Sequence, residues 1–131
     1  MTVLALDYGS ARTGVAVSDP TGTVARPVGV VEQAGSDDGL ARLAELVEEL
    51  EAERVVVGKP LTMRGEAGEQ AAETELFVSR LRETLTVPVE SFDERFTTDL
   101  AEQSGGSHPE DARAAAHLLS SYLTWSSNTR P

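Results

Sequence analysis

The sequence predicts an α/β domain built on a mixed five-stranded sheet with helices flanking it. Near the N-terminus, three apolar segments follow one another with only short turns between them, which is typical of an antiparallel meander. Beyond them, helical spacing and β-branched runs alternate along the chain. That alternation favours two further strands parallel to the first, with the helices covering the sheet.

The composition is that of one globular domain. The chain has 131 residues, of which 40% are hydrophobic and 25% charged. We place the domain at residues 1–125 and expect 126–131 to be a disordered tail. No apolar run reaches the roughly 20 residues of a membrane span, and no signal pattern opens the chain. Zero cysteines exclude disulfides and thiolate metal sites. These features fit a cytoplasmic protein that does not associate with membranes.

The balance of charge limits how the protein could bind a partner. The net charge is −11, from eleven basic and twenty-two acidic residues. Broad, non-specific nucleic-acid binding depends on contacts between cations and phosphates, so this balance argues against it. A metal-dependent phosphodiester enzyme stays open, because bound divalent cations can supply the local positive charge.

The meander carries the first candidate site residue. We expect strands at 3–6, around 15–17 and at 23–31, with a turn at Asp19-Pro20-Thr21-Gly22 between the last two. Asp7 ends the first strand. Burying a lone carboxylate costs several kcal/mol, so Asp7 needs hydrogen bonds, a cation or a metal.

The middle of the chain supplies the other layers of the predicted fold. Apolar residues recur at helical spacing over 39–52 and 68–84, and helix-capping residues precede the first of these helices. The β-branched run at 54–58 predicts a central, doubly buried strand. A fifth strand at 87–92 contains a proline, which favours a position near the edge of the sheet.

The last helix carries a second acidic candidate. Ser107 and Glu110 fit a capping box, which gives Glu110 a structural role. Asp111 instead aligns with Ala115, Leu118 and Tyr122 on the apolar stripe. An acid near a helix start also interacts favourably with the helix dipole, so a purely structural role is the alternative. Its place on the stripe tips the interpretation toward a functional site.

Glu94 is the third acidic candidate, in the segment 93–98 that follows the fifth strand. By itself this segment also fits a solvated loop with a local ion pair. Sites in open α/β sheets form at the carboxyl ends of strands, where Asp7 and Glu94 are expected. If Asp111 converges with them, the cluster is built from oxygen ligands alone, which suits Mg²⁺ or Mn²⁺. Spacing by itself does not establish that convergence.

Four motifs, in order, resemble the YqgF/RuvX family, and the resemblance covers about residues 3–123. The motifs are Leu6-Asp7-Tyr8-Gly9 with Thr13-Gly14-Val15-Ala16, Val56-Val57-Gly58 with Pro60-Leu61, Asp93-Glu94-Arg95-Phe96-Thr97-Thr98, and Asp111-Ala112-Arg113-Ala114-Ala115-Ala116. The resemblance implies a single RNase H-like nuclease domain with Asp7, Glu94 and Asp111 as its catalytic, metal-binding acids. It also implies Mg²⁺ or Mn²⁺ as cofactor, and cytoplasmic processing of the 5′ end of pre-16S rRNA in ribosome biogenesis.

The chain departs from the family pattern at two places. Family members usually carry a basic loop before the last helix, whereas residues 102–110 contain no lysine or arginine. Lys59 and Arg64 follow the fourth strand, where apolar and acidic residues are expected. With Arg12 and Arg95 they are the candidates for binding substrate phosphates. Each of Arg12 and Arg95 also fits an ordinary surface arginine.

Three other functions remain open at this stage. A resolvase-like nuclease would act on branched DNA, and a non-catalytic RNA-binding protein would serve ribosome assembly. A nucleotide-binding module of the sugar-kinase or actin type is disfavoured, since the chain is too short for the two domains that clasp a nucleotide. The oligomeric state and the endo- or exonuclease mode stay open.

Overall fold

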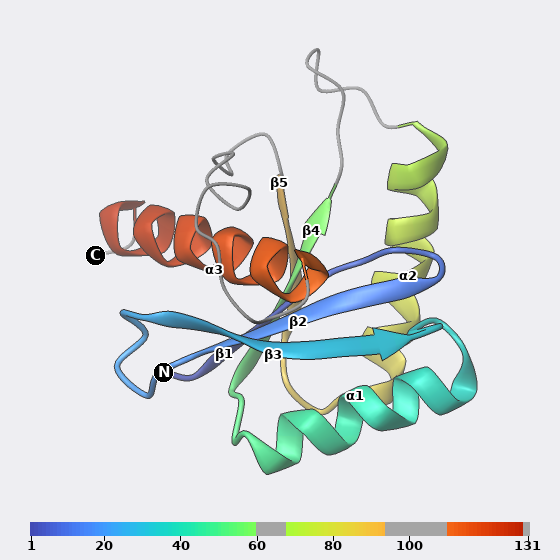
Figure 1. The fold of residues 1–131 in the computed structure, drawn as a ribbon, viewed down its shortest axis with the longest axis horizontal. Coiled ribbons are helices and arrows are strands. Elements are labelled where there is room, and N and C mark those ends of the chain that lie inside the picture. The colour runs from blue at the N-terminus through green and yellow to red at the C-terminus, as the bar shows by residue number, and fades with distance from the viewer. Residues whose placement is uncertain (60–67, 94–109, 130–131) are drawn as a thin grey trace.

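The computed structural model describes residues 1–59, 68–93 and 110–129, and it contains the predicted mixed sheet (Figure 1). The strand order is β3-β2-β1-β4-β5. Strand β1 is antiparallel to β2 and parallel to β4, β2 is antiparallel to β3, and β4 is parallel to β5. The predicted fold class is confirmed. The elements are β1 (Val3–Asp7), β2 (Arg12–Ser18), β3 (Ala25–Glu32), α1 (Asp37–Glu49), β4 (Arg54–Lys59), α2 (Glu69–Thr84), β5 (Val89–Asp93) and α3 (Glu110–Thr129).

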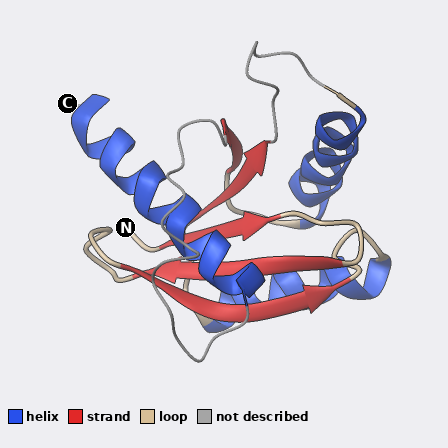
Figure 2. Cartoon of the chain, turned by 45° about the horizontal axis from the view of Figure 1, so that its top comes forward, coloured by secondary structure: helices blue, strands red, loops and turns tan. Residues whose placement is uncertain are grey.

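The molecule has three layers, with α3 on one face of the sheet and α1 and α2 on the other (Figures 1 and 2). Alternation along β1 divides its side chains between two cores. Leu4 and Leu6 pack with residues of α1 and α2, whereas Val3 and Ala5 pack with residues of α3. The same alternation places Asp7, the last residue of β1, on the α3 face.

The central strands are buried as the sequence predicted. Val55, Val56 and Val57 of β4 have no exposed surface, and β4 lies between β1 and β5. Strand β5 forms one edge of the sheet, which is where the proline at its start is tolerated. The predicted turn after β2 is also present, with the Gly22 amide donating to the Asp19 carbonyl at 2.9 Å and Gly22 at φ 72°.

Asp19 holds that turn with its side chain as well. Its carboxylate accepts hydrogen bonds from the Thr21 hydroxyl and from the backbone amides of Thr23 and Val24. These bonds, the one from Thr21 foremost, hold the pKa of the Asp19 carboxyl well below its usual range. The turn between β2 and β3 is therefore held by hydrogen bonds among residues that are close together in the sequence.

Three element boundaries differ from the prediction. Helix α1 begins at Asp37, because the Ser36 hydroxyl accepts from the Gly39 amide and caps it. Strand β2 begins at Arg12, ahead of the strand expected around 15–17, because Arg12 pairs with Glu32 of β3. Helix α3 runs to Thr129, so residues 126–129 are helical where a disordered tail was expected. The proposed cap at Ser107 lies outside the described residues.

Helix α3 is the longest helix, with 20 residues, and its buried face is continuous. Ala115, Leu118 and Tyr122 are buried as the predicted stripe requires. Across the described ranges, neither α3 nor another helix is long and apolar enough to cross a membrane.

Helix α2 offers a direct test of the core between the sheet and the α1/α2 layer. Leu81 is 0% exposed and Leu76, five residues earlier on the same helix, is 68% exposed. We expect Leu81→Ala to lower the free energy of unfolding by about 2–5 kcal/mol, since it leaves a cavity. Leu76→Ala should change it by less than about 0.5 kcal/mol. Urea unfolding followed by circular dichroism measures both, and equal losses would contradict this assignment of faces.

Candidate active site

Asp7 lies at the carboxyl edge of the sheet, where sites in such folds form. It is paired with Gly14 across the β1–β2 ladder. Residues opposite one another in a ladder point to the same face, so Gly14 also faces α3. The Asp7 carboxylate therefore belongs to the layer between the sheet and α3.

Helix α3 begins directly against Gly14. A Cβ built on Gly14 would overlap the carbonyl oxygen of Asp111 and come within 3.1 Å of the Ala112 nitrogen. The helix backbone thus occupies the space that a side chain at position 14 would need. Asp7 pairs with Gly14 in the sheet and the Asp111 backbone rests on that glycine, so the structure brings the backbones of these two predicted acids to the same glycine.

Arg12 is the cation beside these acids. Its Nε lies 3.4 Å from Asp111 Oδ2, with side-chain exposures of 65% for Arg12 and 39% for Asp111. Asp111 is therefore half-exposed at the end of the apolar stripe, while the residues that follow it on the stripe are buried. The exposure leaves Asp111 reachable by an ion or a substrate.

The hairpin between Asp7 and Arg12 is held in place from several sides. The Thr13 hydroxyl accepts from the Gly9 amide and donates to the Gly9 carbonyl, both at 3.4 Å. The Ala11 carbonyl accepts from the Gln33 amide at 2.9 Å, and the Tyr8 ring stacks on Phe77 with centroids 4.3 Å apart. The backbone that carries the first acid and its neighbouring arginine is consequently well defined.

Lys59 occupies the other face of the sheet. It ends β4 with the same alternation as Val57, which packs in the α1/α2 core. Its Nζ lies 2.8 Å from Glu75 Oε1 on α2. Of the four predicted phosphate-binding residues, Lys59 and Arg12 are thus described on opposite faces, and each is paired with a carboxylate.

Glu94, Arg64 and Arg95 lie outside the described residues, so their predicted roles stay predictions. Within residues 1–59, 68–93 and 110–129, no group of three histidine, cysteine or acidic residues is placed to hold a metal ion. Asp7 and Asp111 nonetheless lie on either side of Gly14, and carboxylate oxygens are ligands that suit Mg²⁺ or Mn²⁺. The described part of the chain fits a divalent metal as an incomplete ligand set.

A polar network at the opposite end of α3 was not predicted. Arg54 Nη1 donates to the Tyr122 hydroxyl at 3.1 Å and lies 3.6 Å from Glu90 Oε1, while that hydroxyl donates to Glu90. Burial first, and then the bond to Glu90, raise the pKa of Tyr122. The available signal was a tyrosine on an apolar stripe, since a buried hydroxyl needs a partner.

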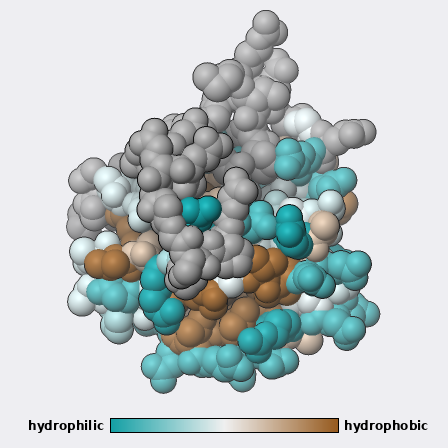
Figure 3. All heavy atoms as spheres, in the orientation of Figure 1, coloured by the Kyte–Doolittle hydropathy of each residue, from teal (hydrophilic) through white to brown (hydrophobic). Residues whose placement is uncertain are grey.

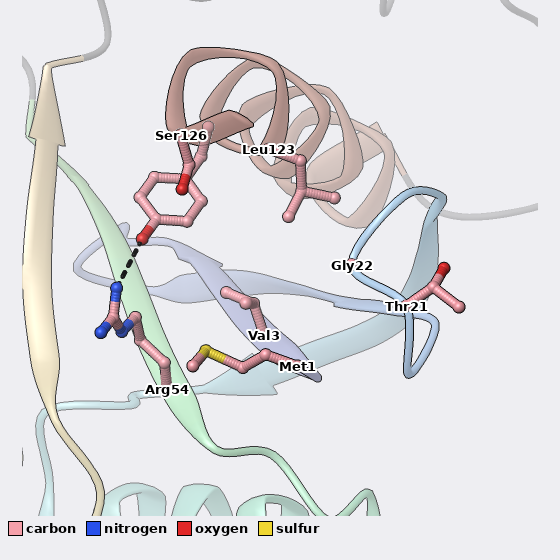
Figure 4. A pocket seen from close by; sticks show the side chains of 8 residues that line it. Met1, Val3, Thr21, Gly22, Arg54, Leu123 and Ser126 are labelled. Carbon is pink, nitrogen blue, oxygen red and sulfur yellow. Dashed lines mark hydrogen bonds between the residues drawn. The ribbon is translucent and has the colours of Figure 1, made fainter. Parts of the chain in front are cut away.

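Two pockets lie away from the acids. One of about 250 Å³ runs under the C-terminal half of α3 and is lined by Arg54, Val3 and Met1 (Figure 4). In it Arg54 makes its hydrogen bond to the Tyr122 hydroxyl. Its strongest polar groups already bond one another. The other, of about 150 Å³, lies where hydrophobic side chains reach the surface between β3 and α1 (Figure 3). Neither contains a predicted site residue.

Solved structures of low sequence identity share this fold. RuvC from T. thermophilus, solved in complex with a Holliday junction substrate, aligns with a TM-score of 0.61 and 18% identity over 95% of this chain and 96% of that one. A fowlpox virus resolvase, solved with Holliday junction DNA, aligns with a TM-score of 0.56 and 12% identity over 95% and 98%. The fold is that of the RNase H-like resolvases.

The sequence comparisons give the family. The family model described as "RuvX: Holliday junction resolvase" matches residues 1–125. A protein of Chloroflexus aggregans, named as a pre-16S rRNA nuclease, is 48% identical over 78% of this chain and 72% of its own length. Another of the same name, from Syntrophomonas wolfei, is 37% identical over 94% of each chain. The chain belongs to the RuvX family, which confirms the resemblance and replaces the nucleotide-binding interpretation.

Gly14 allows a test of the contact that joins the two acids. Gly14→Ala should lower the free energy of unfolding by about 2–3 kcal/mol, because the new methyl group meets helix backbone that cannot simply rotate away. Gly29 of β3 is the matched control, since a Cβ there meets nothing within 4 Å. Gly29→Ala should be neutral or stabilise by up to about 1 kcal/mol. Chemical denaturation measures both, and a harmless Gly14→Ala would disprove the close approach.

Proposed function

We propose that this protein is a metal-dependent ribonuclease that processes the 5′ end of the 16S rRNA precursor in the cytoplasm. The observation that carries the proposal is the seating of α3 on Gly14, which sets Asp111 beside the end of β1 where Asp7 lies. The names of the relatives in Chloroflexus and Syntrophomonas support the choice of substrate. Nucleases of this family generally depend on divalent metals, which supports the cofactor.

In this proposal Asp7, Glu94 and Asp111 hold one or two Mg²⁺ or Mn²⁺ ions. A bound divalent metal would supply the Lewis acidity for hydrolysis of a phosphodiester bond. The chain's own contribution is to fix the carboxylates in advance: Asp7 ends a central strand, and Asp111 opens a helix whose backbone touches the neighbouring strand. Ligands on such rigid elements lose little freedom when an ion binds.

Substrate phosphates need cations that the acidic surface does not otherwise provide. We assign this role first to Arg12, which lies on the α3 face next to Asp111. Arg64 and Arg95 are further candidates from the sequence. Lys59 would have to leave Glu75 before it could contact a strand of nucleic acid passing the sheet edge.

Branched DNA is the second candidate substrate. It is favoured by the description of the matching family model as a Holliday junction resolvase. The net charge of −11 disfavours the wide phosphate contacts that a four-way junction offers. A non-catalytic role in ribosome assembly is the remaining alternative, and the same experiment separates it.

Cleavage of a model RNA with the 5′ leader of the 16S precursor tests the proposal. In Mn²⁺, Asp7→Asn and Asp111→Asn should each lower the cleavage rate by more than about 100-fold, since ligands matter more than the outer-shell groups whose loss costs 10–100-fold. Asp38→Asn is the control, because it makes the same change of charge at an exposed position of α1. Gel analysis of end-labelled RNA gives the rates.

Each other result has a defined meaning. Undiminished cleavage in both Asp7→Asn and Asp111→Asn would refute the assignment of the acids. Cutting of four-way junctions without cleavage of RNA would transfer the function to branched DNA. Binding of the RNA without cleavage in any divalent metal would favour the non-catalytic alternative.

A further inference from the structure

The pairing of Arg12 leaves most of its guanidinium unused. The contact to Asp111 is made through Nε at 3.4 Å, and the side chain is 65% exposed. Its two Nη groups make no hydrogen bond to the described residues. A guanidinium held by one nitrogen can bind a second anion with the two that remain.

The backbone at Arg12 is held by its neighbours, whereas its side chain extends into solvent and can change direction. A Cβ on Gly9 would overlap the Arg12 carbonyl oxygen, so the turn is closed tightly at this point. Arg12 also pairs with Glu32 of β3, and the preceding Ala11 carbonyl is bonded to Gln33. The backbone thus keeps the guanidinium within reach of Asp111 while its long side chain can turn outward.

Arg12 and a divalent metal would compete for the same carboxylate. An exposed ion pair contributes only about 0–1 kcal/mol, so a doubly charged ion at Asp111 can displace the arginine. Lys59 does not take part in this exchange, since it is held by Glu75 on the opposite face. Once displaced, Arg12 carries a free positive charge beside the acids, with a fork of donors suited to a phosphate.

We propose that Arg12 is a metal-responsive positioning residue, which neutralises Asp111 before the metal binds and turns to a substrate phosphate when the metal displaces it. This inference rests on the proposed metal site. It makes metal binding and nucleic-acid binding cooperative, because each partner takes one half of the resting ion pair. It also gives Arg12 a function, the exchange of one anion for another, that a fixed surface ion pair lacks.

The test measures binding in two steps, with Arg12→Gln as the variant. Mn²⁺ affinity in the absence of RNA is measured by electron paramagnetic resonance of the free ion. Arg12→Gln should bind Mn²⁺ about two- to fivefold more tightly than the wild type, which is the gain from losing a competing exposed ion pair. The affinity for the 5′-leader RNA is then measured by fluorescence anisotropy with and without Ca²⁺, used to slow cleavage. The enhancement of RNA affinity by the metal should shrink by about the same two- to fivefold in the variant, because coupling between two sites is reciprocal.

Arg42→Gln is the matched control. It removes the same charge from α1, on the other face of the sheet, where Arg42 pairs with Glu45 and Glu49. Both affinities should equal those of the wild type. Mn²⁺ affinity that is unchanged or weaker in Arg12→Gln, or an undiminished effect of metal on RNA binding, would overturn the inference while leaving the proposed function intact. A wild type that binds no Mn²⁺ would overturn both.

Discussion

The closeness of α3 to β2 at Gly14 is the constraint on which the candidate site depends. Because position 14 has no side chain, the helix backbone lies directly on the strand. The residues that follow are small where the helix is close, with Ala112 and Ala115 fully buried. Farther along, Tyr122 packs with Phe92 and Trp125 over a pocket of about 250 Å³. Side-chain size along α3 thus matches a helix that touches the sheet at the acids and leaves more space at its other end.

A carboxylate near each end of α3 is paired with an arginine, but the two pairs differ in burial and in the number of partners. At the far end, Glu90 is paired with Arg54 and Tyr122 in a partly buried network in which each polar group has a partner. At the near end, Asp111 has one exposed arginine on one edge of its carboxylate. A satisfied network is rigid and favours structure, whereas a half-neutralised, accessible carboxylate can exchange partners. This contrast distinguishes the candidate active site from the pocket of about 250 Å³, whose polar groups already bond one another.

Local sequence patterns were sufficient to predict the strands and helices that form the layers of the fold. The same patterns could not predict contacts between residues that lie far apart in the sequence. Periodicity predicted the meander, the buried β4 and the stripe of α3, since each depends on neighbours in sequence. That Arg12 belongs to β2 depends on its pairing with Glu32, and that Lys59 is held by Glu75 depends on α2 packing against β4. The approach of Asp111 to the strand that pairs with β1 depends on Gly14, which lies 97 positions earlier in the chain (position 14 against 111). The residues around Gly14 give no local signal that a helix will lie against it.

The acidity of the chain then bears on how a nuclease of this family would select its substrate. With a net charge of −11, long-range electrostatics oppose the approach of any nucleic acid. Affinity therefore has to come from a few short-range contacts around the acids, with divalent metal supplying charge that the protein lacks. Under that condition a cation that becomes available only when metal is present has a large relative effect. Arg12 is in that position, and its exposed pairing with Asp111 makes nucleic-acid binding conditional on a loaded site.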